Sequence, residues 1–205
     1  MESKTFGRWF IALGVVLQVI IYIVTGSALL SCISGILGVV SVVLCSQRKM
    51  HFYTFGFAQL ITYVVLCYHQ KLYGEIVENV FYFVTMLYGV FHWWNHYDDK
   101  MAEVETRKLS YGQNWLVALL VFFGVMILYG FLGGTDDTQP FMDSVTTVPA
   151  FMAQILMILR FRESWIYWLI IDIGSIIMWA IAGDWCMVSQ FVFWSINCLY
   201  GLRKW

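Results

Sequence analysis

The sequence predicts an all-α membrane protein with eight transmembrane helices. One extra N-terminal helix precedes two parallel repeats of three helices, which a linker helix joins. Three observations support this prediction. The chain is 60% hydrophobic and 19% aromatic with only 12% charged residues, which is typical of long membrane spans and not of soluble domains. Its apolar residues form eight separate runs, and its second half repeats a pattern from the first.

Each apolar run is close to the length of about twenty residues that crosses a bilayer. The predicted spans are 6–26, 28–46, 51–69, 73–95, 113–132, 141–160, 164–182 and 184–202. The first run is long for a signal peptide and lacks a clear A-x-A cleavage site, so we interpret it as a helix. The expected parts are an N-terminal helix at 1–27, a three-helix bundle at 28–97, a cytoplasmic loop at 98–112, a linker helix at 113–132 and a second bundle at 141–205.

The lysine and arginine residues predict the orientation. With eight spans alternating across the membrane, eleven of the 12 basic residues fall on the side of both termini, and only Lys71 falls on the other side. The positive-inside rule therefore predicts cytoplasmic termini. Adding or removing one internal span would scatter the charges over both sides, so the same distribution supports the number of spans.

Several classes of function are not supported by the residues present. A net charge of -1 and the lack of a basic tract give no reason to expect a nucleic-acid partner. The five cysteines lie in apolar runs without a CxxC pair, which favours small core residues. His92 and His96 are one turn apart, but no third histidine or cysteine is near them, so we expect no metal and no other cofactor. No catalytic triad, phosphate loop or HExxH motif suggests an enzyme.

The internal repeat has an offset of 112 residues. Residues 81–93 and 193–205 are both aromatic-rich and both continue as Leu-Tyr-Gly-x-x-x-Trp, and the same offset pairs Arg48 with Arg160. Because three helices are an odd number, the linker helix at 113–132, which has no counterpart in either sequence repeat, gives both copies the same orientation. Transporters with such parallel repeats bind substrate near the membrane midplane, between the repeats.

The last helix of each repeat carries a polar stripe. Polar side chains inside spans are costly, so each needs an explanation. Both stripes have the spacing i, i+4, i+7, i+11, which is one helical face. They could join helices through hydrogen bonds, but two matching stripes that face one axis favour a substrate path. The stripes are Glu78, Tyr82, Thr85 and Gly89, and their repeat partners Gln190, Trp194, Asn197 and Gly201.

Asp172 lies near the centre of the span 164–182. Three roles are open for it: a protonated core group, a proton-coupling acid, or a counter-charge to a cationic ligand. Other polar candidates inside spans are Gln59, Tyr63, Thr146, Thr147 and Gln154. Deep indole rings, at Trp179 and Trp194, could stack on a heteroaromatic ring and attract a cation. Together these groups suit a flat, cationic molecule that carries hydroxyl groups.

Several motifs resemble the nicotinamide riboside transporter family known as PnuC, and the similarity covers about 28–205. The P-F-x-D-S and E-S-W-x-x-W motifs together are the most specific. The matching stretches are Tyr73-Gly74-Glu75, the run 79–93, Pro140-Phe141-Met142-Asp143-Ser144, Ile155-Leu156-Met157, Glu163-Ser164-Trp165-Ile166-Tyr167-Trp168 and the terminal Leu-Tyr-Gly-Leu-Arg-Lys-Trp.

The resemblance implies a homotrimeric facilitator of the bacterial inner membrane with a SWEET-like arrangement of three, one and three helices. Members of the family release a vitamin B3 precursor for NAD biosynthesis to a cytosolic kinase, which traps it by phosphorylation. Relatives carry thiamine, riboflavin or deoxynucleosides. Two residues depart from the family pattern: Val90 replaces the first Trp of a W-x-x-W motif, and Asp172 stands where many members have Asn.

We therefore expect a uniporter for nicotinamide riboside that lies in the lipid bilayer. Thiamine, or another vitamin or nucleoside, is the alternative substrate on the same scaffold, and a structural or receptor subunit without transport is the alternative class. The residues expected to contact the ligand are Gln154, Asp172, Trp194 and Asn197. The residues expected to line the path or complete the site are Gln59, Tyr63, Glu78, Tyr82, Thr85, Thr147 and Gln190.

Overall fold

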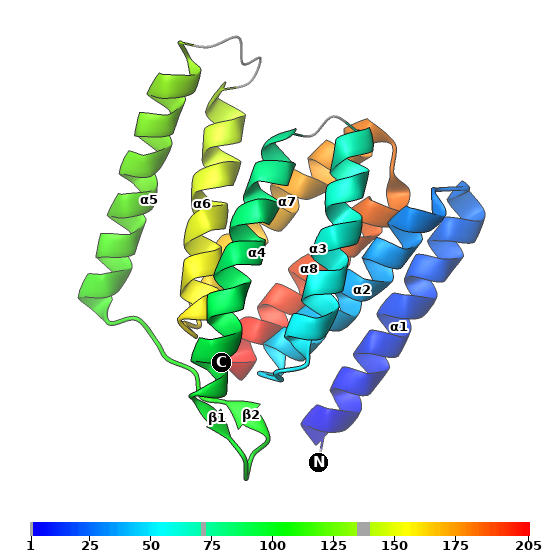
Figure 1. The fold of residues 1–205 in the computed structure, drawn as a ribbon, viewed down its shortest axis with the longest axis horizontal. Helices are drawn as coiled ribbons and strands as arrows, with labels where there is room; N and C mark the ends of the chain where they lie inside the picture. Colours follow the sequence, from blue (N-terminus) through cyan, green and yellow to red (C-terminus); the bar gives the residue numbers. More distant parts are fainter. Residues whose placement is uncertain (1, 71–72, 135–139) are drawn as a thin grey trace.

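The computed structural model describes residues 2–70, 73–134 and 140–205 (Figure 1). Within these ranges the chain forms eight helices and one short hairpin, which confirms the predicted all-α fold. The elements are α1 (Glu2–Thr25), α2 (Leu29–Ser46), α3 (Phe52–His69), α4 (Tyr73–Trp94), β1 (Tyr97–Asp98), β2 (Glu103–Val104), α5 (Tyr111–Leu132), α6 (Pro140–Ile158), α7 (Ser164–Ala182) and α8 (Trp185–Lys204).

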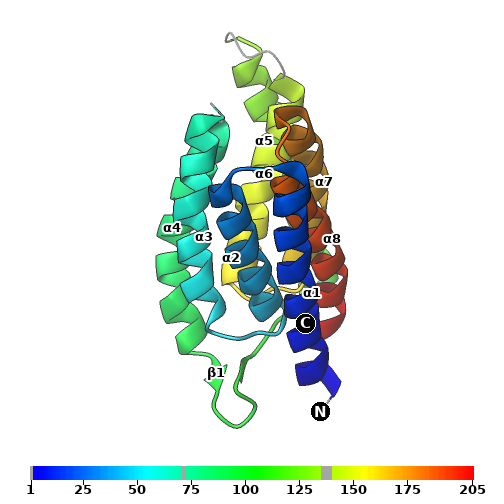
Figure 2. The ribbon, with the colours of Figure 1, turned by 90° about the vertical axis from the view of Figure 1, so that its right-hand side faces the viewer.

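The helices run side by side, and both termini lie at the same end of the molecule as the hairpin (Figures 1 and 2). We call this the termini end and the opposite one the far end. Short signals define where helices begin and end. Gly183 ends α7 with a left-handed φ of 78°, and the carboxylate of Asp184 then caps α8 by accepting a hydrogen bond of 3.2 Å from the Met187 amide.

Four of the helices in the described residues are long and apolar enough to cross a membrane on composition alone: Gly7–Thr25 of α1, together with α2, α5 and α7. Helices α3, α4, α6 and α8 have similar lengths of 18 to 22 residues. They carry more polar side chains, many of which face the interior of the helix bundle. In contrast, α5 has no buried residue, as expected for a helix that faces lipid.

The sequence repeat is also a repeat of backbone conformation. Arg48 follows α2 with a φ of 62°, and its counterpart Arg160 follows α6 with a φ of 66°. The Arg48 amide donates to the Cys45 carbonyl at 2.8 Å, and the Arg160 amide donates to the Met157 carbonyl at 3.0 Å. Left-handed conformations cost non-glycine residues about 1–2 kcal/mol. Finding the same unusual turn 112 residues apart therefore supports an internal duplication.

A pseudo-twofold axis relates the two repeats. The thiol of Cys45 lies 3.4 Å from the sulfur of Met157, and the rings of Trp93 and Trp205 have centroids 5.7 Å apart. The members of each pair are 112 residues apart in the sequence. Because a residue can contact its own counterpart only close to a twofold axis, these pairs mark where the axis passes between the bundles.

Reciprocal hydrogen bonds confirm this symmetry. The Trp93 indole donates to the Ile158 carbonyl at 3.1 Å, and the Trp205 indole donates to the Ser46 carbonyl at 3.1 Å. Ser46 and Ile158 are also 112 residues apart. Each bundle therefore ends in a tryptophan that binds the first helix of the other bundle, so the predicted parallel repeat is present in the structure.

The two additional helices take related places, although only α5 lies between the sequence repeats. Helix α1 packs against α2, and α5 packs against α6, the counterpart of α2. They stand at opposite edges of the molecule (Figure 1). Glycine permits both contacts: a Cβ at Gly14 would lie 2.6 Å from Val39 Cγ1, and one at Gly124 would lie 2.8 Å from Val148 Cγ1. Helix α1 therefore packs against the first helix of one bundle, as the linker helix packs against the first helix of the other.

The segment 97–110 crosses the termini end, and we call it the strap. The Val104 amide donates to the Arg48 carbonyl at 3.0 Å. The Arg107 amide donates to the Arg160 carbonyl at 2.8 Å. The strap is thus hydrogen-bonded to the two symmetry-related turns, one in each bundle.

Charge reinforces the strap. The Glu103 carboxylate forms ion pairs with Arg48, with Lys49 at 3.4 Å and with Lys204 at 3.9 Å. Arg48 and Lys49 belong to the first bundle, and Lys204 lies at the end of the second. One acid therefore connects both bundles at the end where most basic residues gather.

Candidate functional site

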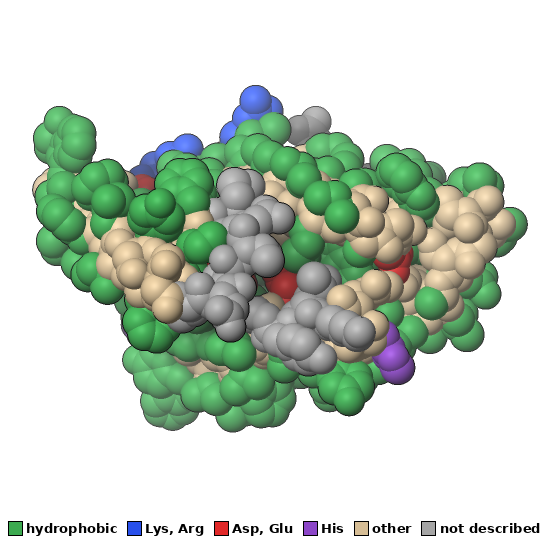
Figure 3. All heavy atoms as spheres, turned by 90° about the horizontal axis from the view of Figure 1, so that it is seen from above, with side chains coloured by type: hydrophobic (Ala, Val, Ile, Leu, Met, Phe, Trp, Pro, Cys, Tyr) green, Lys and Arg blue, Asp and Glu red, His purple; other side chains and the backbone are tan. Residues whose placement is uncertain are grey.

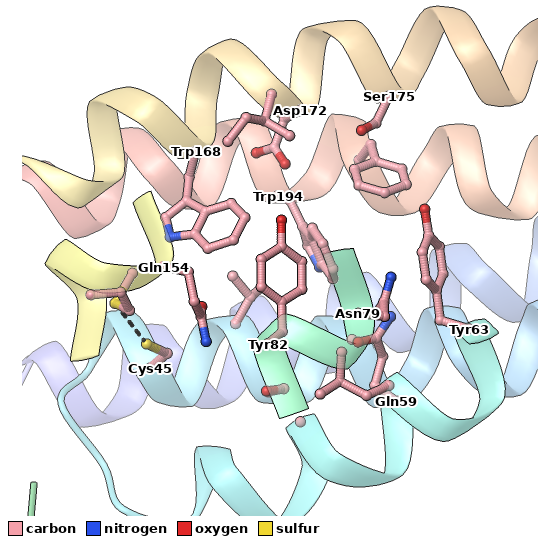
Figure 4. Close-up of a pocket in the computed structure, with 18 of the residues that line it drawn as sticks. Cys45, Gln59, Tyr63, Asn79, Tyr82, Gln154, Trp168, Asp172, Ser175 and Trp194 are labelled. Carbon is pink, nitrogen blue, oxygen red and sulfur yellow. Dashed lines mark hydrogen bonds between the residues drawn. The ribbon is translucent and has the colours of Figure 1, made fainter. Parts of the chain in front are cut away.

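A cavity of about 160 Å³ lies between the two bundles and is lined by side chains from α2, α3, α4, α6, α7 and α8 (Figure 4). One water molecule needs roughly 10–15 Å³ of such space, so the cavity holds several. Its position on the pseudo-twofold axis agrees with the site expected from the repeat. Helices α1 and α5 contribute no lining residue among those described.

The lining follows the symmetry of the backbone. Nine pairs of lining residues are 112 positions apart, so most positions occur once in each bundle. The pairs are Val42 and Gln154, Cys45 and Met157, Gly56 and Trp168, Gln59 and Ile171, Leu60 and Asp172, Tyr63 and Ser175, Asn79 and Phe191, Tyr82 and Trp194, and Met86 and Cys198.

The chemistry of the lining does not follow that symmetry. Asp172 corresponds to Leu60, and Trp168 corresponds to Gly56. At these two positions the second bundle presents an acid and a large ring, whereas the first bundle presents leucine and glycine. The cavity therefore suits a ligand that itself has two unlike ends.

Seven of the eleven predicted site residues line the cavity: Gln59, Tyr63, Glu78, Tyr82, Gln154, Asp172 and Trp194. They come from α3, α4, α6, α7 and α8, and those labelled in Figure 4 point toward the same space. The structure thus brings together residues that are more than one hundred positions apart in the sequence.

Two of the other four predicted residues join helices instead. The Asn197 amide donates to the Val42 carbonyl at 3.1 Å, and the Gln154 amide donates to the Thr85 hydroxyl at 3.1 Å. These contacts join equivalent positions in the two repeats, because 42 corresponds to 154 and 85 to 197, although the donor is on α8 in one repeat and on α6 in the other. Asn197 also accepts a hydrogen bond of 2.9 Å from the Ser46 hydroxyl. In this structure, Thr85 and Asn197 hold α4 to α6 and α8 to α2.

Gln190 and Thr147 lie just behind the lining. Gln190 is fully buried beside Gly38, where a Cβ would lie 3.2 Å from its amide nitrogen, and neither polar atom of its side chain has a hydrogen-bond partner. Thr147 forms a hydrogen bond with Glu78. These two residues support lining residues and are not themselves part of the cavity wall.

Three carboxylates line the cavity, and no lysine, arginine or histidine is among its described lining residues. Glu75 accepts a hydrogen bond of 3.0 Å from the Tyr63 hydroxyl, and Glu78 accepts one of 3.1 Å from the Tyr82 hydroxyl. Because buried carboxylates are unfavourable without a counter-charge or a proton, this cavity favours a positively charged occupant.

Aromatic rings form much of the remaining wall. Tyr82 and Trp168 meet edge to face with centroids 5.7 Å apart, and the buried indole nitrogen of Trp194 has no hydrogen-bond partner. Trp179, expected as a deep stacking ring, lies outside the cavity and donates to the Tyr63 hydroxyl at 3.0 Å. The aromatic residues that do line the cavity are Phe52, Tyr63, Tyr82, Trp165, Trp168, Phe191 and Trp194.

Sequence reasoning missed several lining residues, including Trp168, Ser175, Glu75 and Asn79. The helical spacing that identified the two polar stripes could also have identified Trp168 and Ser175. With Asp172 they occupy positions i, i+4 and i+7 of α7, which is one helical face. That face corresponds to Gly56, Leu60 and Tyr63 of α3, where the pattern is hidden by glycine and leucine.

The two ends of the cavity differ. At the termini end, a buried apolar cluster that includes Trp93, Trp205 and the strap residue Val104 closes the space between the bundles. Figure 3 looks onto the far end, where most of the coloured surface is hydrophobic and acidic side chains are visible near the middle. Apolar helices around a polar, aromatic cavity between two parallel repeats define a membrane transporter.

Comparison with known proteins identifies the family. Residues 28–205 match the sequence model of a family described as nicotinamide mononucleotide transporter. A protein from Haemophilus influenzae named nicotinamide riboside transporter PnuC is 31% identical over 206 residues, which cover 98% of this chain and 90% of that protein. A protein of the same name from Neisseria mucosa is 27% identical over 221 residues, covering 100% of this chain and 84% of that protein.

A solved structure supports the same assignment. This chain superimposes on the crystal structure described as that of the vitamin B3 transporter PnuC with a TM-score of 0.86 and 26% sequence identity. The match covers 98% of this chain and 90% of the chain in the crystal structure. The chain therefore belongs to the PnuC family, whose members are transporters and not enzymes. This confirms the resemblance found in the sequence and indicates a multi-pass bacterial membrane protein.

Proposed function

We propose that the protein carries nicotinamide riboside across the bacterial inner membrane. The observation that supports this most directly is the cavity on the pseudo-twofold axis, whose described lining combines indole rings, amides and carboxylates and includes no basic residue. Nicotinamide riboside has a flat cationic ring and a ribose with hydroxyl groups. The indole rings and carboxylates can bind the cationic ring, and the amides can form hydrogen bonds with the hydroxyl groups. The relatives named above are described as transporters of this compound.

The lining favours the riboside over the mononucleotide in the family description. The two compounds differ by a phosphate group, which carries about −1.5 to −2 charges near neutral pH. Phosphate sites in proteins use arginine, lysine or backbone amides. Here the phosphate would meet Glu75, Glu78 and Asp172 instead, so we expect phosphorylation to prevent entry.

This discrimination fits metabolic trapping. If both termini are cytoplasmic, as the basic residues predict, a cytosolic kinase that phosphorylates the riboside removes it from the pool that can return. The transporter then needs no energy source of its own. We propose facilitated diffusion by alternating access, in which the two bundles rock about the cavity. The strap and the apolar cluster that contains Trp93 and Trp205 then form the gate at the termini end.

Within the cavity, we propose that Gln154, Asp172 and Trp194 contact the ligand. Gln59, Tyr63, Glu78 and Tyr82 line its path. Thr85, Thr147, Gln190 and Asn197 complete the site from behind, through the contacts described above. The homotrimer implied by the family resemblance is part of the proposal, and native mass spectrometry in detergent would test it.

Flux into proteoliposomes tests the function. With the membrane potential clamped at zero, labelled nicotinamide riboside should enter saturably until the two sides are equal, and a proton uncoupler should not change the rate. Empty liposomes supply the background. Accumulation above the outside concentration would contradict facilitated diffusion. Flux at the background rate with intact ligand binding would instead support a receptor or structural subunit.

Thiamine is the second candidate because its thiazolium ring is also a flat cation. Two departures from the family pattern are compatible with thiamine as the substrate: the acid at Asp172, and Val90 in place of the first tryptophan of the family motif. Competition decides between the two compounds. Unlabelled nicotinamide riboside should reduce labelled flux at lower concentration than thiamine does, and the reverse order would assign the protein to thiamine.

A further inference from the structure

We propose that Asp172 is the residue that makes the cavity selective for a positively charged ring. This inference rests on the proposed function and adds a reason for its specificity. It starts from the asymmetry of the lining, because the position equivalent to Asp172 in the first bundle is Leu60. The acid is thus not needed to build this part of the fold, since the same backbone position is filled by an apolar side chain in the other repeat.

Among the residues that the structure describes, Asp172 has only a weak hydrogen-bond partner. Its side chain is 2% exposed, and the hydrogen bond it accepts comes from the Cys198 thiol, at 3.4 Å from Oδ2. A thiol is a weak donor. A buried carboxylate normally has an ion pair or several strong hydrogen bonds, and a cationic ligand in the adjacent cavity would supply the missing charge.

The other two acids of the cavity are better satisfied. The tyrosine hydroxyls of Tyr63 and Tyr82 donate to Glu75 and Glu78 at 3.0 and 3.1 Å. Thr147 also forms a hydrogen bond with Glu78. Of the three carboxylates, Asp172 therefore gains the most from a positive charge placed in the cavity.

The rings near Asp172 suit the same ligand. Trp168 lies one turn before Asp172 on α7, and Trp194 projects from α8 into the same space (Figure 4). The faces of indole rings attract cations. The amides of Gln59 and Asn79 project from the first bundle. The second bundle thus places an acid and two indole rings where they can meet the charged ring, and Gln59 and Asn79 of the first bundle offer amides to the ribose hydroxyls.

A matched pair of ligands isolates the effect of charge. Nicotinamide riboside and its reduced dihydro form share the same skeleton, but the reduced ring is neutral. Equilibrium binding of both compounds to the purified wild-type protein should favour the cation by about thirtyfold, which is the lower end of the loss found when a buried charge pair is broken. The Asp172→Asn variant should lower this ratio to within about threefold while it still binds the neutral form.

Two further variants serve as controls. Asp172→Glu keeps the charge and should retain a preference of at least tenfold. Glu78→Gln removes a carboxylate that already accepts hydrogen bonds, and it should lower the ratio less than Asp172→Asn does. Thermal unfolding without ligand establishes that each variant is folded.

The outcomes separate the inference from the proposed function. If the wild-type protein binds neither compound, the proposed function is wrong. If it binds both compounds equally well, the inference is wrong although the function stands, and this result requires no variant. An Asp172→Asn protein that keeps the wild-type ratio would also overturn the inference.

Discussion

The first bundle, α2–α4, and the second, α6–α8, agree in some contacts and differ in others. Trp93 and Trp205 donate equivalent hydrogen bonds to the opposite bundle, and Thr85 and Asn197 take part in equivalent contacts between helices. Along the cavity, by contrast, equivalent positions carry unlike side chains. The difference suggests that contacts made in both bundles hold the fold, and that positions which differ between the bundles bind the ligand.

The strongest test of this division is the replacement of Trp93 by alanine. Trp93 is fully buried, contacts Trp205 and donates a hydrogen bond to the other bundle. Removing a buried tryptophan costs about 3–5 kcal/mol of unfolding free energy, so the thermal midpoint of Trp93→Ala in detergent should fall sharply. The adjacent Trp94, which is 69% exposed, provides the control. Equal midpoints for Trp93→Ala and Trp94→Ala would refute a structural role for the symmetric contact.

A smaller loss of stability is expected for Asn197→Ala. Asn197 is fully buried and makes hydrogen bonds to Ser46 and Val42. Their loss should cost about 1–3 kcal/mol, and the affinity of the folded protein for nicotinamide riboside should change by less than about threefold. Thr85→Val removes the equivalent contact in the other repeat and should follow the same pattern with a smaller loss. A tenfold loss of affinity with unchanged stability would place Asn197 among the ligand-binding residues after all.

The smallest effect is expected for Glu103→Gln, which sharpens the comparison between the two ends of the cavity. Partly exposed ion pairs contribute about 0.2–1 kcal/mol each. Loosening the strap should therefore raise the rate at which a membrane-impermeant reagent labels the cavity thiols Cys45 and Cys198 from the termini side by about threefold. Asp99→Asn removes an exposed acid of the same strap and serves as the control. Faster labelling from the far side only would contradict a gate at the termini end.

The fold could be predicted from the sequence because long apolar runs leave few alternatives. The span predicted at 164–182 matches α7, Ser164–Ala182, and the span at 28–46 differs from α2 by one residue. The route of the strap could not be predicted in the same way. Its position depends on backbone carbonyls exposed by the turns at Arg48 and Arg160, and hydropathy does not reveal such turns.

The candidate site could be predicted only in part. Helical spacing identifies which side chains share a face, but it does not say what lies opposite that face. Tyr82 and Thr85 are on the same stripe, yet Tyr82 lines the cavity and Thr85 is bonded to Gln154 of α6. The place of α1 depends on a similar detail, since a Cβ at Gly35 of α2 would lie 2.5 Å from the side chain of the buried Gln18.

The closeness of the axis to the cavity has a consequence for how such a protein can evolve. Cys45 lies 3.4 Å from its own counterpart Met157, so the walls of the cavity face each other across a short space. In a dimer of identical bundles, an aspartate at the position of Leu60 and Asp172 would occur twice, and two like charges would confront each other over one ligand. Covalent fusion of the halves allows an acid at this position in one bundle and an apolar side chain at the equivalent position in the other.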